Sequence, residues 1–329
     1  MIFQPAALAL LLASSLNALM LLASGVFALH LLRHWNPASG SERQIALERR
    51  TYLVSTLVGL SLLIGLPALA LFVHNADAMA PFFTGAMCAV GSLKVNAWGM
   101  PALLTMLAGF FLATAWLVMN QLDSLGWDTP LMRGKYRLLL LLAPLALAQA
   151  ALLWLYYLNL NPEVITSCCG SLFGPAGEGV ASEMAALPLA WVQPVFFAGW
   201  LLTLVAGTVF IRRGRLGRVF GILAGLHLPL ALAAVVAFIA PYIYEQPNHH
   251  CPFCLLQAEH AYAGWVLYLP LFFGTAAGIG AGLAAAVRAD SLAQAAPRVA
   301  VSLAKWSVAA LGLFGLAVLF YLQRSNLVM

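Results

Sequence analysis

Five cysteines are the residues of this chain that are best suited to chemistry. Cys251 and Cys254 form a C-x-x-C, Cys168 and Cys169 are adjacent, and Cys88 stands apart from the other four. A cysteine thiolate is a nucleophile in disulfide exchange and a ligand for soft metal ions. Thiols gathered at one membrane surface would indicate such chemistry, whereas thiols scattered through helices would be packing residues.

The chain that positions these cysteines is too apolar to be soluble. Of its 329 residues, 63% are hydrophobic and 8% are charged, and the mean hydropathy is +0.93. A soluble domain carries about a quarter charged residues. Because a membrane span needs about 20 mostly apolar residues, we predict an all-α integral membrane protein in the lipid bilayer, one polytopic domain over residues 1–329. The eight expected transmembrane spans are roughly 6–32, 52–73, 101–120, 137–158, 187–211, 219–243, 254–287 and 299–322.

The basic residues predict how these spans are oriented. If the N-terminus is outside, all but two of the 16 Lys and Arg residues fall in or beside the inner connections, and only Lys94 and Arg324 lie outside. Cytoplasmic loops of membrane proteins carry such an excess of positive charge. We therefore expect a multi-pass protein of the inner (cytoplasmic) membrane with both termini outside. The net charge of +5 then follows from topology and does not indicate nucleic-acid binding.

This topology places every cysteine in an outer loop. The three outer loops and their cysteines are 74–100 with Cys88, 159–186 with Cys168 and Cys169, and 244–253, after which the C-x-x-C ends at Cys254. The predicted side is periplasmic or extracytoplasmic, where disulfides form and persist. The cysteines are therefore expected to form one chemically active face.

The C-x-x-C stands at the predicted start of the seventh span. Proline, here Pro252, suits a first helical turn, and the positive end of the helix dipole would stabilise a thiolate on Cys251, with Cys254 as the resolving thiol. Glu259 and His260 follow closely and are candidates for proton transfer, or else are solvated at the interface. The alternative for the pair itself is a structural disulfide.

The stretch Cys251-Pro-Phe-Cys254-Leu-Leu-Gln257 resembles the Cys-x-x-Cys-x-x-Gln/Glu run of bacterial membrane disulfide-bond-forming quinone reductases (DsbB), and more distantly vitamin K epoxide reductases. In those families the C-x-x-C lies at the outer end of a transmembrane helix beside a quinone. A second cysteine pair relays electrons to or from a periplasmic thioredoxin-like partner. The resemblance implies that Cys251 and Cys254 are the quinone-proximal pair and that Cys168 or Cys169 is the relay.

The same residues also suit a metal site. Thiolate and imidazole ligands favour Zn(II) or Cu(I). The candidate ligands on the predicted outer side are Cys251, Cys254, His249, His250, Cys168, Cys169 and Cys88. Covalent c-type haem needs C-x-x-C-H, and it is not expected because Leu255 follows Cys254.

Three hypotheses follow from the sequence. The first is a membrane thiol–disulfide oxidoreductase that exchanges electrons between its cysteines and a quinone or a periplasmic thiol partner. The second is a membrane protein that binds or transports copper or zinc through the same cysteines and histidines. The third is a non-catalytic subunit of a larger membrane complex whose cysteines form structural disulfides, which would leave one of the five unpaired.

Overall fold

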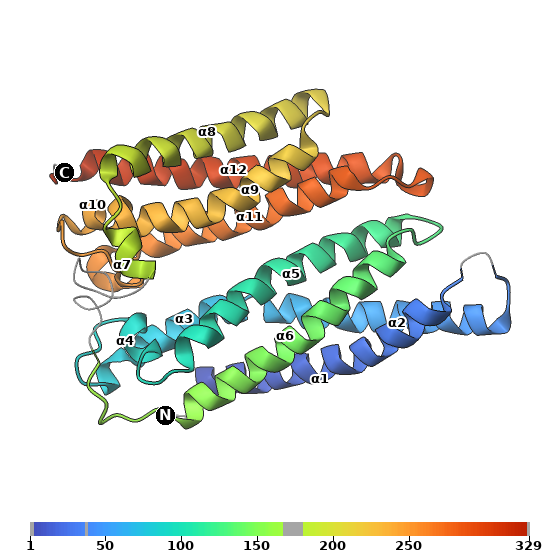
Figure 1. Ribbon diagram of the computed structural model, residues 1–329, viewed down its shortest axis with the longest axis horizontal. Helices are drawn as coiled ribbons and strands as arrows, with labels where there is room; N and C mark the ends of the chain where they lie inside the picture. Colours follow the sequence, from blue (N-terminus) through green and yellow to red (C-terminus); the bar gives the residue numbers. More distant parts are fainter. Residues whose placement is uncertain (1–2, 37–38, 167–179, 328–329) are drawn as a thin grey trace. The chain divides into compact units, whose positions relative to one another are not determined.

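The computed structural model describes residues 3–36, 39–166 and 180–327, and this part of the chain contains helices and no strand (Figure 1). Eight of the helical segments are long and apolar enough to cross a membrane. The predicted all-α membrane fold is therefore confirmed. The expected single domain stays a prediction, because the contacts divide the chain into two compact units, each described here by itself.

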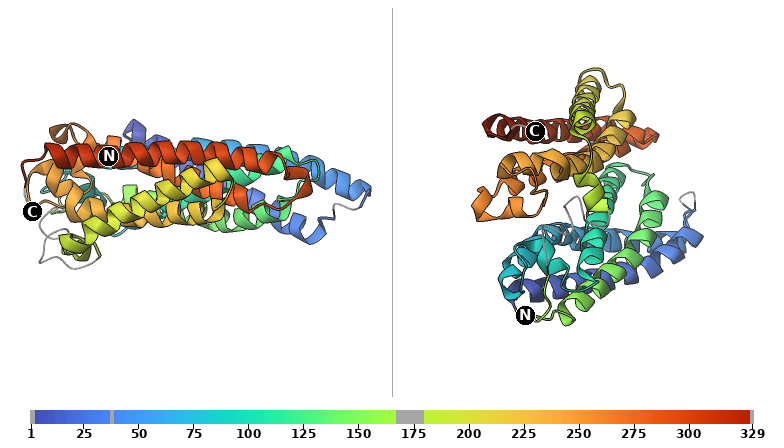
Figure 2. Two further views of the ribbon diagram at one scale, coloured as in Figure 1. Left: turned by 90° about the horizontal axis from the view of Figure 1, so that it is seen from above. Right: turned by 60° about the vertical axis from the view of Figure 1, so that its left-hand side comes forward.

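Unit 1 comprises residues 1–78, 93–162 and 288–295 and contains the first four spans. Its helices are α1 (Pro5–His34), α2 (Glu42–Gly65), α3 (Ala68–Ala78), α5 (Gly99–Leu125) and α6 (Met132–Leu158). α1 packs along α6, and α6 packs along α5 (Figures 1 and 2). The large side chains Trp116 and Tyr136 are fully buried in the core of this unit.

Unit 2 comprises residues 79–92, 163–287 and 296–329 and contains the last four spans. Its long helices are α8 (Leu189–Arg213), α9 (Gly217–Ala234), α11 (Ala263–Ala286) and α12 (Ala295–Arg324). A π-helical stretch (Val235–Ile239) and α10 (Ala240–Tyr244) continue α9 to the end of its span. Short elements complete the unit: η1 (Ala80–Phe82), α4 (Ala89–Leu93), α7 (Val180–Ala185), η3 (Cys254–Leu256) and η4 (Ala258–His260).

Helices α9 and α11 approach each other through glycines. A Cβ atom added to Gly221 would lie 2.6 Å from the Cα of Gly282, and one added to Gly282 would lie 2.7 Å from the Cα of Gly221. Glycine removes the steric barrier to such backbone contact, which is how membrane helices gain dispersion energy where lipid cannot drive them together. This contact fixes the two helices that flank the C-x-x-C segment.

Two predicted helix boundaries are wrong. The second span extends from α2 into a separate helix α3, because Pro67 has no backbone N–H to continue the hydrogen bonds of α2 and its ring clashes with the carbonyl four residues earlier. The seventh span does not begin at Cys254: α11 begins at Ala263, after the short turns η3 and η4. The connection between α10 and α11 is therefore longer than the predicted 244–253.

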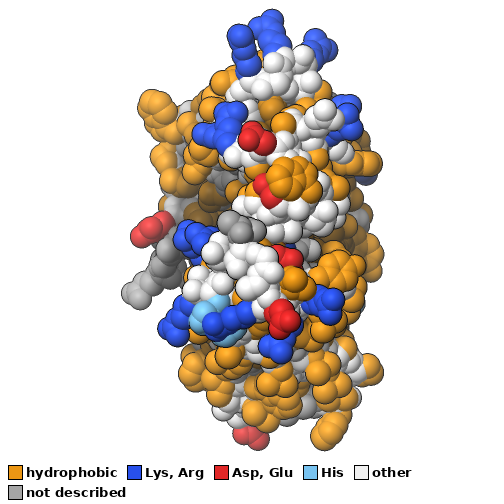
Figure 3. Space-filling view, turned by 90° about the vertical axis from the view of Figure 1, so that its right-hand side faces the viewer, with side chains coloured by type: hydrophobic (Ala, Val, Ile, Leu, Met, Phe, Trp, Pro, Cys, Tyr) orange, Lys and Arg blue, Asp and Glu red, His pale blue; other side chains and the backbone are white. Residues whose placement is uncertain are grey.

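In unit 2 the described cysteines lie at one end of the helices and the arginines of the α8–α9 connection at the other, while Arg324, at the end of α12, lies at the cysteine end. The arginine end is where α8 ends at Arg213 and α9 begins at Gly217, and the cysteine end is where α10 ends at Tyr244 and α11 begins at Ala263. The 28-residue span between them is about 42 Å long at 1.5 Å per residue, which matches a bilayer. Figure 3 looks onto basic helix ends and shows their Lys and Arg side chains. That the cysteines and both termini lie outside the cell stays a prediction.

Candidate thiol cluster

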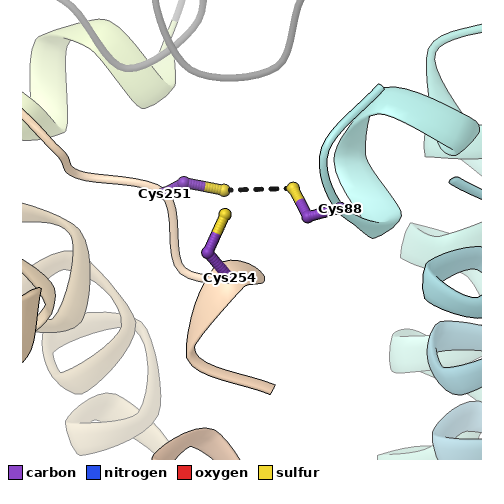
Figure 4. A group of neighbouring side chains, drawn as sticks. All are labelled: Cys88, Cys251 and Cys254. Atoms are coloured by element: carbon purple, nitrogen blue, oxygen red, sulfur yellow. Dashed lines mark hydrogen bonds between the residues drawn. The ribbon is translucent and has the colours of Figure 1, made fainter. Parts of the chain in front are cut away.

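Three cysteines of unit 2 converge at its cysteine end (Figure 4). The Sγ atoms of Cys88, Cys251 and Cys254 all lie within 4.8 Å of one another. The closest pair is Cys88 and Cys251, with 3.6 Å between the sulfurs, which is longer than the roughly 2.0 Å of a disulfide bond. Their exposed fractions are 0%, 0% and 3%, so we call this buried group the thiol cluster.

Cys88 is held at the start of a short helix. Its carbonyl accepts the N–H of Gly91 at 2.9 Å and so begins α4. The preceding turn contains Gly85, whose φ of +84° favours glycine, and a Cβ there would lie 2.0 Å from the carbonyl oxygen of Thr166. The N–H of Thr166 in turn bonds the carbonyl of Thr84 at 2.9 Å. The chain leading to Cys88 is thus fixed against a second segment of the same unit.

Two tyrosines hold the backbone of the C-x-x-C. The hydroxyl of Tyr244, at the end of α10, donates to the carbonyl of Cys251 at 2.5 Å. The hydroxyl of Tyr268, in α11, donates to the carbonyl of Pro252 at 2.7 Å. Because both helices contribute an anchor, the position of Cys251 depends on how α10 and α11 are packed.

Gln257 joins the two halves of the cluster. Its side-chain Nε2 donates to the carbonyl of Met87 at 2.7 Å, and Met87 is the residue before Cys88. The glutamine of the C-x-x-C-x-x-Gln run therefore ties the segment of Cys254 to the segment of Cys88. Sequence reasoning noticed Gln257 only as part of a resemblance and missed this positioning contact.

The expected helix-dipole activation of Cys251 is not supported by the geometry. Cys251 precedes a three-residue 3-10 turn, η3, and the long helix α11 begins only at Ala263. Between them Ala261 and Tyr262 adopt left-handed φ values of 51° and 55°. The C-x-x-C therefore lies outside the first turn of α11, where the dipole argument had placed it.

The nearby polar residues are arranged around the cluster and not inside it. His250 donates through Nδ1 to the carbonyl of Val236 at 2.8 Å, in the π-helical stretch. The rings of His249 and His260 pack against the ring of Tyr244 at centroid distances of 4.2 and 4.3 Å. Glu259 is exposed in η4.

Two consequences follow for these polar residues. The ring of Tyr244 contacts the ring of His260, and its hydroxyl donates to the carbonyl of Cys251, so Tyr244 connects His260 to the cluster. Glu259 and His260 occupy a surface turn and not the interior of the seventh span. The pKa of His260 is lowered, mainly by burial and secondly by the charge of His249. This shift favours a neutral ring at pH 7. A neutral imidazole is a competent proton acceptor.

The structure brings together three of the five cysteines that the sequence singled out. Cys168 and Cys169 lie outside the described residues. Among the described residues, the group that could hold a metal ion contains Cys88, Cys251 and Cys254 and neither His249 nor His250. Cys88 gave no local signal in the sequence, because its 163-residue separation from Cys251 is closed only by tertiary packing.

No family model, no curated protein and no solved structure matches the chain. What the thiol cluster does is therefore argued from its chemistry alone.

Proposed function

We propose that this chain is a membrane thiol–disulfide redox protein whose reacting centre is the thiol cluster. The observation that carries the proposal is the mutual approach of three sulfurs within 4.8 Å. Disulfide exchange requires three sulfurs, one that attacks, one that is attacked and one that leaves. The cluster provides that minimum set from a C-x-x-C and one further cysteine.

The first step is a thiol–disulfide exchange among the three cysteines, and it needs no other reactant. With Cys251 and Cys254 joined as a disulfide, the thiolate of Cys88 attacks Sγ of Cys251, the closest sulfur at 3.6 Å. The Cys251–Cys254 bond breaks, a Cys88–Cys251 bond forms, and Cys254 leaves as the thiolate that takes up the proton Cys88 lost. No net charge is added, which suits a buried apolar site because burying an unpaired charge is costly.

Net electron transfer involves a second two-electron couple. A membrane quinone would oxidise the two thiols of Cys251 and Cys254 to a disulfide and become a quinol, taking up both protons. A dithiol partner of the periplasmic thioredoxin-like class would reverse this by being oxidised itself. Because the cysteines of the cluster are at most 3% exposed, we assign direct contact with a soluble partner to loop cysteines, Cys168 or Cys169. Thr166, two residues before Cys168 in sequence, bonds Thr84 near Cys88 and supports that relay.

Thiol trapping tests the redox proposal. Membranes are quenched in acid, alkylated with a large maleimide and analysed by gel shift, before and after treatment with dithiothreitol and then a soluble quinone. We expect the Cys251–Cys254 pair to change between disulfide and dithiol, and Cys88→Ser to slow its exchange with the loop cysteines. A pair that remains in one state throughout would contradict the proposal. Ser92→Ala is the control, because Ser92 lies in α4 and is as deeply buried as Cys88.

A second candidate, soft-metal binding, is favoured by the sulfur separations. With metal–sulfur bonds of about 2.3 Å, two thiolates on one ion lie about 3.8 to 4.0 Å apart, close to the 3.6 Å of Cys88 and Cys251. Three convergent thiolates suit Cu(I) or Zn(II). A fourth ligand would come from outside the described group.

Elemental analysis separates the two candidates. The protein is purified without chelators and without oxygen, and compared with a Cys251→Ser/Cys254→Ser variant. A stoichiometric copper or zinc content that the variant loses would favour the metal function. Redox cycling of a metal-free protein would favour thiol–disulfide exchange.

A further inference from the structure

Unit 1 contains a cavity of about 480 Å³ that takes no part in the proposed redox function. It is lined by the first half of α2, the end of α5, the α5–α6 connection and the beginning of α6. Its size falls within the range of ordinary small-molecule sites, about 300 to 1,000 Å³. All of its lining residues belong to unit 1.

A buried ion pair forms the inner wall of this cavity. Nζ of Lys135 lies 2.6 Å from Oδ2 of Asp123, and the two side chains are 5% and 1% exposed. The other carboxylate oxygen of Asp123 accepts the N–H of Leu131 at 2.8 Å. Lys135 also donates to Oδ1 of Asn120 at 3.1 Å. The ion pair is thus fixed at both of its charged groups.

The inner wall retains hydrogen-bond donors for a ligand. An ammonium group has three N–H donors, and those of Lys135 have two acceptors, Asp123 and Asn120, among the described residues. The amide Nδ2 of Asn120 has no acceptor in the same part of the chain. Since both residues line the cavity, the remaining N–H groups favour an oxyanion.

The outer wall of the cavity favours a cation. Glu48 and Asp128 are exposed carboxylates that line the cavity, and each is held by a neighbour, Gln44 for Glu48 and Ser291 for Asp128. The nearly buried ring of Trp35 lines the cavity with them. Carboxylates and aromatic faces are the groups that bind an organic ammonium ion.

We propose that this cavity binds a small zwitterion, with its oxyanion on Lys135 and Asn120 and its ammonium group beside Glu48 and Asp128. Two sources share this chemistry: a free molecule such as an amino acid, and the phosphoethanolamine headgroup of a membrane phospholipid. The proposal stands on unit 1 alone and is independent of the cysteines.

The test uses the full-length protein, purified in detergent and stripped of lipid. Calorimetric titration with O-phosphoethanolamine is compared with ethanolamine, which lacks the oxyanion, and with inorganic phosphate, which lacks the amine. We expect O-phosphoethanolamine to bind more tightly than either fragment. In a second arm, native mass spectrometry measures retention of phosphatidylethanolamine against phosphatidylglycerol. Selective retention of the lipid with weak binding of the free compound identifies the headgroup as the source, and the reverse identifies a free ligand.

Three variants make the test specific. Asn120→Leu and the paired replacement Lys135→Met/Asp123→Leu, which leaves no lone buried charge, are expected to raise the Kd of the bound zwitterion by about 10- to 100-fold, the usual effect of losing a hydrogen bond to a charged group. Glu48→Gln is expected to weaken zwitterion binding but not phosphate binding. Glu42→Gln, at the start of α2 and outside the cavity, is the control. No selective binding by folded wild-type protein, or equal binding by the paired variant, would overturn the proposal.

Discussion

Units 1 and 2 bury their polar chemistry in different ways. Unit 1 buries full charges, Lys135 against Asp123, and each charge depends on the other. Unit 2 buries three thiols, which pack like small hydrophobic side chains when they are not reacting. Unit 1 therefore depends on its polar site for stability, whereas the thiols of unit 2 can exchange bonds without leaving an unpaired charge buried.

Breaking the ion pair of unit 1 tests this difference directly. Lys135→Met leaves the carboxylate of Asp123 buried without its partner, and removal of one member of a buried pair costs about 3 to 5 kcal/mol in the free energy of unfolding. Unfolding in mild detergent, followed by circular dichroism, measures it. Lys135→Met/Asp123→Leu should recover most of the loss, and Cys88→Ala should cost far less. Equal losses of stability for Lys135→Met and Cys88→Ala would contradict the difference between the two units.

The glycine contact of unit 2 gives the next largest effect. Gly221→Ala places a Cβ 2.6 Å from the Cα of Gly282, so the helices must separate, and overpacking of this kind costs about 1 to 3 kcal/mol. Because Tyr268 of α11 anchors the C-x-x-C, we also expect faster alkylation of Cys251. Gly312→Ala, in α12 with no atom within 4 Å of the added Cβ, is the matched control. Unchanged stability and labelling in Gly221→Ala would contradict the close approach.

Gln257→Leu should loosen the thiol cluster without unfolding the protein. It removes the donor to the carbonyl of Met87, a loss of about 1 kcal/mol. The yield of a Cys88–Cys251 disulfide under mild oxidation should fall, as measured by proteolysis and mass spectrometry. Gln246→Leu, at an exposed glutamine of the same connection, serves as the control. If both variants form the disulfide equally well, Gln257 does not position Cys88.

The smallest effect concerns pH. Because the pKa of His260 is lowered in the folded protein, mainly by burial and secondarily by His249, the unfolded chain binds its proton more readily. The contribution of His260 to stability is therefore present above its ordinary pKa and is lost as the pH falls below it. We expect a small decrease in Tm between about pH 7.5 and about pH 5.5 that His260→Gln reduces. His34→Gln, at an exposed histidine of unit 1, should leave the decrease unchanged.

The sequence predicted the membrane spans well because a span is recognised by length and hydropathy, which are local properties. The start of α11 was predicted wrongly for a local reason too. The apolar run after Cys254 has the composition of a helix, and nothing in Ala261 or Tyr262 signals the left-handed backbone that delays it. A small-residue pattern such as that of Gly274, Gly278 and Gly282 in α11 is legible in the sequence and predicts close helix packing.

The candidate site was predictable only in part. The C-x-x-C was recognisable from spacing, whereas the place of Cys88 beside it depends on Gln257, on Gly85 and on the packing of helices far apart in the chain. The ion pair of unit 1 was not predicted from the sequence, for a different reason. Lys135 was counted among the basic residues that orient the protein, and only the structure places it against Asp123.

The contact between α9 and α11 also bears on how the protein enters the membrane. Among the eight candidate spans, the one that contains α9 has the highest mean hydropathy, 2.4, and α11 has the lowest, 1.6. A weakly apolar segment inserts poorly by itself, but it can leave the insertion machinery together with a strongly apolar neighbour as a helical hairpin. If the cysteine end faces outside, as the basic residues predict, we expect the segment of Cys251 and Cys254 to cross the membrane as the tip of that hairpin.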